Sequence, residues 1–449
     1  MNYTTMLSAV VKELGDEYTY SSLMAGAIEL WSKMYMGKAP WNNGTVLSAG
    51  VSSSIASEVA KLVTIELNSE IDGSDLLNTE YQKNVLSKLR KFAEYGLAKG
   101  SLIIKPIVDE NGLRTQFIQA DRFFPISFDS GGNLTKCVLA DQLRKGKTIY
   151  TLLEIHTIEN GILTVENRVF KSQSDGILGS RIDLTEVDKW AALSPNPERF
   201  SGINKLPFGL FRCPIANNID SDSPLGVSVY SRAVELIREA DRRYSGECWE
   251  FEAKEAAVNV AESMLKYNKE QDKYDYPGGK ERLYRAFDIS KGVADEALIE
   301  TYSPDIRQKA YSDGYNEQLR KIEFACSLAY GTISDPNNVD KTATEIESSK
   351  QRSYTLVSDC QAAMQTALEE WAEGAFFWAR LYGFERGSSY DMSFEWGDSI
   401  LANPEAEREE DRKDLANGTL RPEEYRAKWR DEDIDTALAN LPQSAEVIE

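Results

Sequence analysis

Two long stretches with a helical repeat flank residues 256–303, and this arrangement constrains the fold more than any other feature of the sequence. The first starts at Ser223-Pro224, where serine can cap a helix and proline is tolerated in the first turn, and its apolar residues recur every three or four positions to about Lys254. The second runs from Asp305 to Tyr330. About thirty helical residues span on the order of 45 Å, so the sequence predicts two long helices joined by an insert.

The insert is predicted to contain strands. Residues 266–280 form a tyrosine-rich hairpin candidate that turns at Pro277-Gly278-Gly279, and residues 282–289 supply the second strand. After the second long helix, a polar loop leads to Thr342-Ala343-Thr344-Glu345, which opens a third long helix that reaches about Tyr382. An acidic helical tail is expected from Pro404 to Leu441.

The first 210 residues indicate an α+β fold. Helical spacing extends from Tyr3 to about Leu67 and again from Glu80 to Gly96, and it is followed by short β-rich runs with turn signals such as Glu159-Asn160-Gly161 between them. These runs cover 101–108, 114–118, 123–128, 136–142, 147–158 and 162–171. Helices gathered in front of antiparallel strands argue against a doubly wound parallel sheet, in which strands and helices alternate.

The charge balance disfavours proteins that grip nucleic acid by neutralising phosphates. The chain has 51 Lys and Arg against 72 Asp and Glu, a net charge of −21. Its five cysteines are far apart, without a Cys-x-x-Cys pair, which indicates a reduced interior. We expect no export signal and no membrane-spanning segment, because no apolar run is long enough.

The motif inventory excludes the commonest enzyme classes. His156 is the only histidine and lies in a predicted strand, so a structural role is favoured, and we expect neither a catalytic triad nor a zinc site. Phosphate-binding and dinucleotide-binding glycine motifs are absent from the sequence, and we expect no cofactor. Two acidic clusters could form a magnesium site, but solvated helix faces are the favoured interpretation. These clusters are Glu247, Glu250 and Glu252, and Asp431, Glu432, Asp433 and Asp435.

Several runs along the chain resemble the portal proteins of tailed phages, in the listeriophage A118-like branch related to the SPP1-like portals. The longest is Asn204 to Asp220, followed by Ser223 to Ser228. Ser303 to Arg307, Lys341 to Ile346, Ala416 to Leu420 and Glu424 to Arg426 agree with it in the same order. The resemblance rests on this order and on the pattern of elements between the runs.

The resemblance implies a non-enzymatic ring of about twelve copies at one capsid vertex, assembled in the bacterial cytoplasm and part of the virion. Double-stranded DNA would slide through the ring during packaging and ejection. The expected partners are the terminase large subunit, a head-to-tail adaptor, and the major capsid and scaffold proteins. The implied domains are a wing (1–222 and 343–395), two stem helices (223–255 and 304–330), a clip (256–303), a tunnel loop (331–342) and a helical crown (396–449).

The resemblance also suggests which residues serve each role. Asn337, Asn338 and Lys341 of the tunnel loop could touch phosphate weakly. The basic clip residues Lys273, Lys280, Arg282 and Arg285 could dock the terminase or the adaptor by charge complementarity. In the stem, Leu236, Ile237 and Tyr244 are expected to pack subunits together.

Blander interpretations remain open beside these. The tunnel loop could be an ordinary connector, the clip a mixed-charge surface, and the acidity only a source of solubility rather than a channel wall that repels DNA. At the level of function, a minor capsid or scaffold protein is the alternative within the same particle, and a magnesium-dependent carboxylate nuclease is the alternative from another class.

Overall fold

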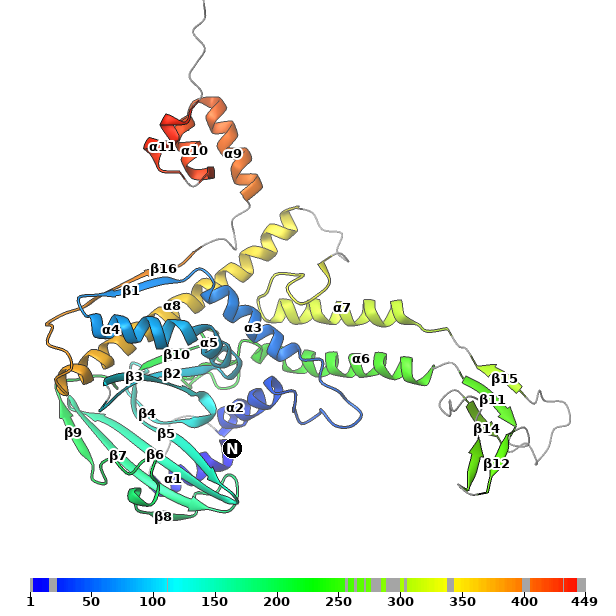
Figure 1. The fold of residues 1–449 in the computed structure, drawn as a ribbon, viewed down its shortest axis with the longest axis horizontal. Helices are drawn as coiled ribbons and strands as arrows, with labels where there is room; N and C mark the ends of the chain where they lie inside the picture. Colours follow the sequence, from blue (N-terminus) through cyan, green and yellow to red (C-terminus); the bar gives the residue numbers. More distant parts are fainter. Residues whose placement is uncertain are drawn as a thin grey trace, which may run out of the picture.

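The computed structural model describes residues 3–15, 22–110, 112–254, 257–261, 265–269, 272–275, 284–287, 299–302, 305–336, 343–397, 404–430 and 432–441. Helices and antiparallel strands build a broad body, from which a pair of helices extends to a small β module (Figure 1). The α+β class predicted from the sequence is confirmed. Among the described residues, no helix combines the length and the apolar character needed to cross a membrane.

The body begins with helices that bury their apolar faces. They are α1 (Tyr3–Leu14), α2 (Ser22–Tyr35), α3 (Val51–Thr64), α4 (Asp75–Glu80) and α5 (Ser87–Lys99), with a π-helical turn at Tyr81–Leu86 between the last two. Trp31, Tyr81 and Tyr230 are among the largest fully buried side chains of the main core. The predicted spacing of three and four is confirmed for the buried face of α3 and for Ala27, Trp31 and Met34 of α2, whereas Leu23 of the same pattern is 65% exposed.

Antiparallel strands follow, as the alternating runs predict. One sheet has the order β10-β2-β3, and a larger one has the order β4-β5-β6-β7-β8 with β9 paired to β7. The bounds are β2 (Ser101–Asp109), β3 (Gly112–Gln119), β4 (Phe123–Phe128), β5 (Leu134–Lys145), β6 (Thr148–Glu159), β7 (Ile162–Ser172), β8 (Ser180–Ile182), β9 (Glu198–Ser201) and β10 (Gly209–Arg212). The β6–β7 turn has positive φ at Asn160 (51°) and Gly161 (74°), which the Asn-Gly signal requires.

The first long helix starts later than the sequence suggests. The capped start at Ser223-Pro224 is wrong, because α6 spans Val234–Ala253 and is preceded by a short 3₁₀ turn at Ser231–Ala233. Residues just before it are bound to the body: Val229 N donates to Leu97 O at 2.9 Å, and a Cβ on Gly226 would lie 2.2 Å from Gly100 O. This close backbone contact holds the segment in an irregular path.

The insert is a β module, but its pairing differs from the prediction. Its strands are β11 (Ala257–Ala261), β12 (Lys266–Asn268), β13 (Lys273–Asp275), β14 (Tyr284–Phe287) and β15 (Ile299–Tyr302). β12 pairs with β13, so the chain reverses between Asn268 and Lys273, whereas Pro277-Gly278-Gly279 lies outside the described residues. The expected second strand does not join this hairpin, because β14 pairs with β11 in parallel.

The chain returns to the body through α7 (Gln308–Ala325) and α8 (Ala343–Leu381). α8 packs closely on β10, where a Cβ on Gly209 would lie 1.8 Å from Ala367 O. After α8, β16 (Asp391–Glu395) pairs antiparallel with β1 (Asn68–Asp72) and joins distant parts of the chain. The tail is helical as predicted but broken into α9 (Pro404–Asn417), α10 (Pro422–Arg430) and α11 (Ile434–Ala439).

Candidate functional site: the α6–α7 pair and the loop that follows it

Helices α6 and α7 lie side by side and antiparallel along their length (Figure 1). Gln318 Nε2 donates to Leu236 O at 2.9 Å near the body, and Arg243 Nη1 donates to Gly314 O at 2.6 Å further out. The rings of Tyr244 and Tyr315 lie 6.3 Å apart. Because side chains of one helix bond to the backbone of the other, the relative register of the two helices is fixed.

Glu250 joins α6 to the start of α7 at the outer end of the pair, which is the end next to the insert. Its carboxylate accepts hydrogen bonds from Arg307 Nε at 3.0 Å and Nη2 at 2.8 Å, and Lys254 Nζ lies 2.7 Å away. Hydrogen bonds from Arg307 and Lys254 hold the pKa of Glu250 well below its usual range, and the carboxylate raises the pKa of Arg307. Lys254 Nζ also donates to Asp305 O at 2.7 Å. The two ends of the insert therefore leave the helices side by side.

Asp241 anchors the body end of α6. Its buried carboxylate accepts hydrogen bonds from Trp41 Nε1 at 2.8 Å, Asn42 Nδ2 at 3.0 Å and Ala49 N at 2.8 Å, all from the α2–α3 loop. One turn further along, Ser245 Oγ accepts from Leu47 N at 2.8 Å. The α2–α3 loop is thus bound along one side of α6.

Glu323 fixes the loop that follows α7. Its carboxylate is 0% exposed and accepts hydrogen bonds from Gly331 N (3.1 Å), Ile333 N (2.7 Å), Ser334 N (2.9 Å) and Ser334 Oγ (2.8 Å). Asp335 N donates to Asn316 Oδ1 at 2.7 Å in the same loop. Converging backbone N–H groups form a concave site for the anion, so this loop is held against α7 as far as Asp335.

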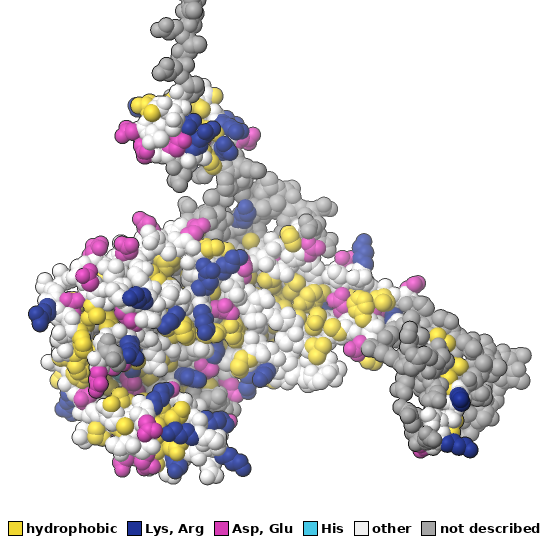
Figure 2. Space-filling view, in the orientation of Figure 1, with side chains coloured by type: hydrophobic (Ala, Val, Ile, Leu, Met, Phe, Trp, Pro, Cys, Tyr) yellow, Lys and Arg dark blue, Asp and Glu magenta, His cyan; other side chains and the backbone are white. Residues whose placement is uncertain are grey.

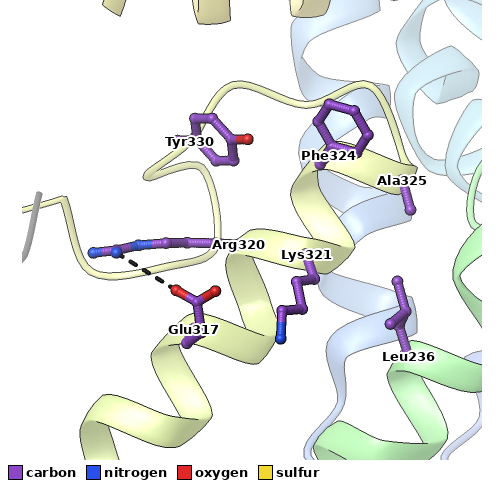
Figure 3. A pocket seen from close by; sticks show the side chains of 7 residues that line it. All are labelled: Leu236, Glu317, Arg320, Lys321, Phe324, Ala325 and Tyr330. Atoms are coloured by element: carbon purple, nitrogen blue, oxygen red, sulfur yellow. Dashed lines mark ion pairs between the residues drawn. The ribbon is translucent and has the colours of Figure 1, made fainter. Parts of the chain in front are cut away.

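A cavity of about 480 Å³ lies where the loop leaves α7 (Figure 3). Leu236 of α6, Tyr330 of the loop and five α7 residues line it: Glu317, Arg320, Lys321, Phe324 and Ala325. Glu317 and Arg320 form an ion pair at 3.9 Å. The cavity therefore combines apolar walls with charged groups of both signs.

Helix α8 contacts two aromatic rings at the end of α7 and in the loop that follows it. The Arg352 guanidinium lies 5.1 Å from the centre of the Phe324 ring and 4.9 Å from that of Tyr330. Ala329 N donates to Ser353 Oγ at 2.6 Å. Phe324 nevertheless remains 63% exposed within the single chain. This exposed ring and the cavity beside it leave a surface that a further element can cover.

The residues expected to pack subunits fall into two groups. Ile237 is 2% exposed and belongs to the core of its own chain, whereas Leu236 lines the cavity and Tyr244 is partly exposed. The subunit-packing role stays a prediction for all three. The burial of Ile237 means that Leu236 and Tyr244 are the two that remain open to a neighbour.

The other predicted site residues are not brought together by the described part of the chain. Asn337, Asn338 and Lys341 lie outside the described residues, as do Lys280 and Arg282. Lys273 begins β13 and Arg285 lies on β14, in different pairings of the insert. Their DNA-contact and docking roles stay predictions.

Three members of the acidic clusters of the sequence have structural partners. Glu250 is bound to Arg307, Glu432 pairs with Arg426, and Asp433 caps α11 by accepting from Thr436 N. Within the described ranges, no group of three or more His, Cys, Asp and Glu side chains is arranged to hold a metal ion. Asp241 and Glu323 were missed from the sequence, because nothing local distinguishes them from the other acids.

On the face drawn in Figure 2, hydrophobic side chains gather along α6 and α7, whereas acidic and basic side chains are interspersed over much of the rest. An apolar band on paired helices indicates a surface that packs against another protein surface.

Comparison with known families decides the identity. The sequence profile described as "Phage portal protein, SPP1 Gp6-like" matches residues 56–428. The chain belongs to this family of phage portal proteins. The match includes the α6–α7 pair, the insert and α8, and it confirms the resemblance drawn from the ordered motifs. A comparison with curated proteins found no significant match to the chain. The portal protein is a structural component of the virion, and its family places it at the portal vertex of the capsid.

Proposed function

We propose that copies of this portal protein close into a ring of about twelve subunits around an open channel that conducts double-stranded DNA during packaging and ejection. In this ring α6 and α7 are the stem, residues 256–303 the clip, residues 331–342 the tunnel loop, the body the wing, and residues 396–449 the crown. The observation that carries the proposal is the antiparallel α6–α7 pair, which has the insert at one end and the Glu323-bound loop at the other.

The apolar surface of the stem supports closure into a ring. A heterologous contact packs one patch of each copy against a different patch of its neighbour, and when it repeats around a rotation axis it covers both patches on every copy. Leu236, Phe324 and Tyr244 contribute apolar or aromatic surface there. The proposal needs closure of the ring, and the number of subunits can differ between isolated protein and virion.

The net charge of −21 supports sliding rather than binding of DNA. Carboxylates that face a channel repel phosphates, so the duplex passes without the many cation contacts that would arrest it. Asn337, Asn338 and Lys341 of the tunnel loop would then supply weak contacts only.

The clip residues Lys273, Lys280, Arg282 and Arg285 would attract acidic surfaces of the terminase large subunit and, later, of the head-to-tail adaptor. The wing would face the major capsid and scaffold proteins.

Electron microscopy of the purified protein, combined with light scattering, tests the ring directly. We expect hollow circular particles in end-on views and a mass that is a multiple of the subunit mass. A protein that stays monomeric at all concentrations, and that is missing from the tail-bearing vertex of filled heads, would contradict the proposal. Labelling at many capsid sites instead of one vertex would favour a minor capsid protein.

A further inference from the structure

The outward face of α5 and of the π-helical turn before it is basic. Its four cations are exposed in the single chain and lie within nine consecutive residues: Lys83, Lys88, Arg90 and Lys91. We call these four residues the basic face of the body. The opposite face of α5 is apolar, because Leu89, Ala93 and Leu97 are buried in the main core. In Figure 2, basic side chains gather over the part of the body where Figure 1 places α4 and α5.

No ion pair neutralises the basic face among the residues that the structure describes. Lys88 Nζ donates to Asn84 Oδ1 at 2.9 Å, and Arg90 Nε donates to Thr64 Oγ1 at 3.1 Å, and both acceptors are neutral. Arg90 also borders a cavity of about 280 Å³ whose other lining residues carry no charge. The positive charges of this face are therefore open to an anion from outside the chain.

The two carboxylates within one helical turn of these cations are used inside the chain. Glu80 lies three residues before Lys83, but it is only 6% exposed. Glu94 lies four residues after Arg90, but its Oε1 accepts a hydrogen bond from Tyr35 OH at 2.6 Å. Residues three or four apart on a helix are neighbours, so these are the positions from which an acid of the same helix could pair with the basic face. Neither does so, and the face keeps its charge within a chain of net charge −21.

The density of charge on this face suits a nucleic-acid backbone. Lys83 and Lys91 are separated by about 12 Å of helix, and duplex DNA carries about seven phosphates over the same length of its axis. Protein surfaces instead present acidic and basic side chains interspersed, as much of this one does in Figure 2. Three of the four cations are lysines, whose ammonium groups are point charges on flexible stems and contact phosphate without a fixed geometry.

We propose that the basic face binds the phosphate backbone of duplex DNA, at a site on the body that is separate from the proposed channel. The proposal takes its ligand from the proposed function, but its site lies on α5 and neither on the stem helices nor on the tunnel loop. Cations that contact phosphates carry no sequence information, so the binding is independent of sequence and sensitive to salt. The excess of acids elsewhere in the chain confines the contact to this face and keeps it weak and reversible.

Fluorescence anisotropy of a labelled DNA duplex, titrated with the full-length protein, tests the site. The logarithm of the association constant should fall linearly with the logarithm of the salt concentration, with a slope of about −2 to −4, because each neutralised phosphate contributes about −0.9. The absence of binding at about 50 mM salt, or binding that does not respond to salt, would overturn the proposal.

Variants locate the binding. Lys88→Gln alone should weaken it about 3- to 10-fold at about 0.1 M salt and make the slope shallower by about 0.9. The fourfold variant Lys83→Gln, Lys88→Gln, Arg90→Gln and Lys91→Gln should weaken it by more than about 100-fold. An unfolding curve like that of the unmodified protein shows that each variant is folded. Unchanged binding by the folded fourfold variant would overturn the proposal.

The matched control removes four other exposed cations of the same kinds, three lysines and one arginine, from strands β5 to β7 and the turn between β5 and β6. The substitutions are Arg144→Gln, Lys145→Gln, Lys147→Gln and Lys171→Gln. Arg144 and Lys145 are ion-paired with Asp175 and Asp188, so they are less available to DNA. Both fourfold variants have the same net charge, and equal losses of binding would show that affinity follows net charge alone and would overturn the site.

Two further readouts separate this site from its alternatives. Labelled polyglutamate with as many charges as the duplex should bind more weakly than DNA, and equal or tighter binding would overturn DNA as the ligand in favour of an acidic protein surface. Light scattering should show the same assembly for both fourfold variants, and loss of rings only in the basic-face variant would make the face a subunit contact instead. Rings that form normally but bind no DNA through this face would overturn this site and leave the proposed ring intact.

Discussion

Asp241, Glu250 and Glu323 each bind a segment that is distant in the chain or that reverses its direction. Asp241 binds the α2–α3 loop, Glu250 binds the start of the returning helix, and Glu323 binds the backbone of residues 331–334. A buried carboxylate is stable only when donors surround it, so each of these side chains selects one loop conformation. At the scale of single residues, the geometry of the paired helices and their loops depends on these three acids.

Glu323→Gln is expected to loosen the loop that follows α7. The substituted side chain can keep its oxygen on the three backbone N–H donors that bond to Oε1, but it turns an NH₂ group toward Ser334 Oγ and loses the charge that strengthens these bonds, which should cost about 1–3 kcal/mol of unfolding free energy. Denaturant unfolding and hydrogen exchange of residues 331–335 measure the loss.

Glu317→Gln is the matched control on the same helix. Glu317 is exposed and its ion pair with Arg320 spans 3.9 Å, so its loss should cost less than about 1 kcal/mol. Equal effects of the two substitutions would show that Glu323 does not hold the loop.

At the scale of elements, α6 and α7 act as one unit because bonds cross between them from the body to the insert. One face of α6 is used inside the subunit, through Ile237 and Asp241, and another includes Leu236 at the open cavity. Substitutions on these two faces therefore have different consequences.

Leu236→Asp is expected to give a folded subunit that fails to form rings, because a charge in the proposed contact must be desolvated on assembly. Ile237→Asp places a charge in the core of the subunit and should cost more than about 3 kcal/mol of stability. Circular dichroism melting separates the two effects, and light scattering reports assembly. Normal rings from Leu236→Asp would remove Leu236 from the interface.

Acidification is expected to weaken the outer end of the pair. The folded-state pKa of Glu250 lies below the unfolded value of about 4.3, so its stabilising contribution is complete well above that pH and is lost as the pH falls toward the folded-state pKa. The difference in melting temperature between the unmodified protein and Glu250→Gln should thus shrink between pH 7 and pH 3. Glu252→Gln, an exposed neighbour on the same helix, should show little difference at either pH.

The success of sequence interpretation depends on how local the deciding contacts are. The strands β2 to β7 were predicted within a few residues, because alternation and the Asn160-Gly161 turn are local signals. The start of α6 was missed because the contact between Gly226 and Gly100 joins distant residues. For the site, the spacing in α6 marked Leu236 and Ile237 as apolar, but only tertiary packing distinguishes the buried one from the open one.

At the scale of the whole molecule, the insert is connected to the body through two adjacent chain segments. Lys254 and Asp305 are joined by a hydrogen bond of 2.7 Å, and Glu250 bonds to Arg307 just inside them. An element whose two ends lie together can be removed without separating the helices that carry it. The body, the paired helices and α8 do not need the insert to define their relative positions.

Replacement of residues 257–302 by a short Gly/Ser linker is expected to leave a folded protein that still forms rings, but one that no longer binds the terminase large subunit. The change in subunit stability should stay below about 1 kcal/mol, because short flexible loops differ little in closure entropy. Light scattering and a pull-down with the terminase measure the two properties. Loss of rings would show that the insert takes part in closure.

Helix α8 connects two distant surfaces of each subunit. It has 39 residues and is therefore about 58 Å long. Near its inner end, Arg352 and Ser353 contact the loop that follows α7, and at its outer end Trp378 borders a cavity on the larger sheet. In the proposed ring, a force on the loop that follows α7 would be carried along this continuous helix to the edge of the larger sheet in the same subunit.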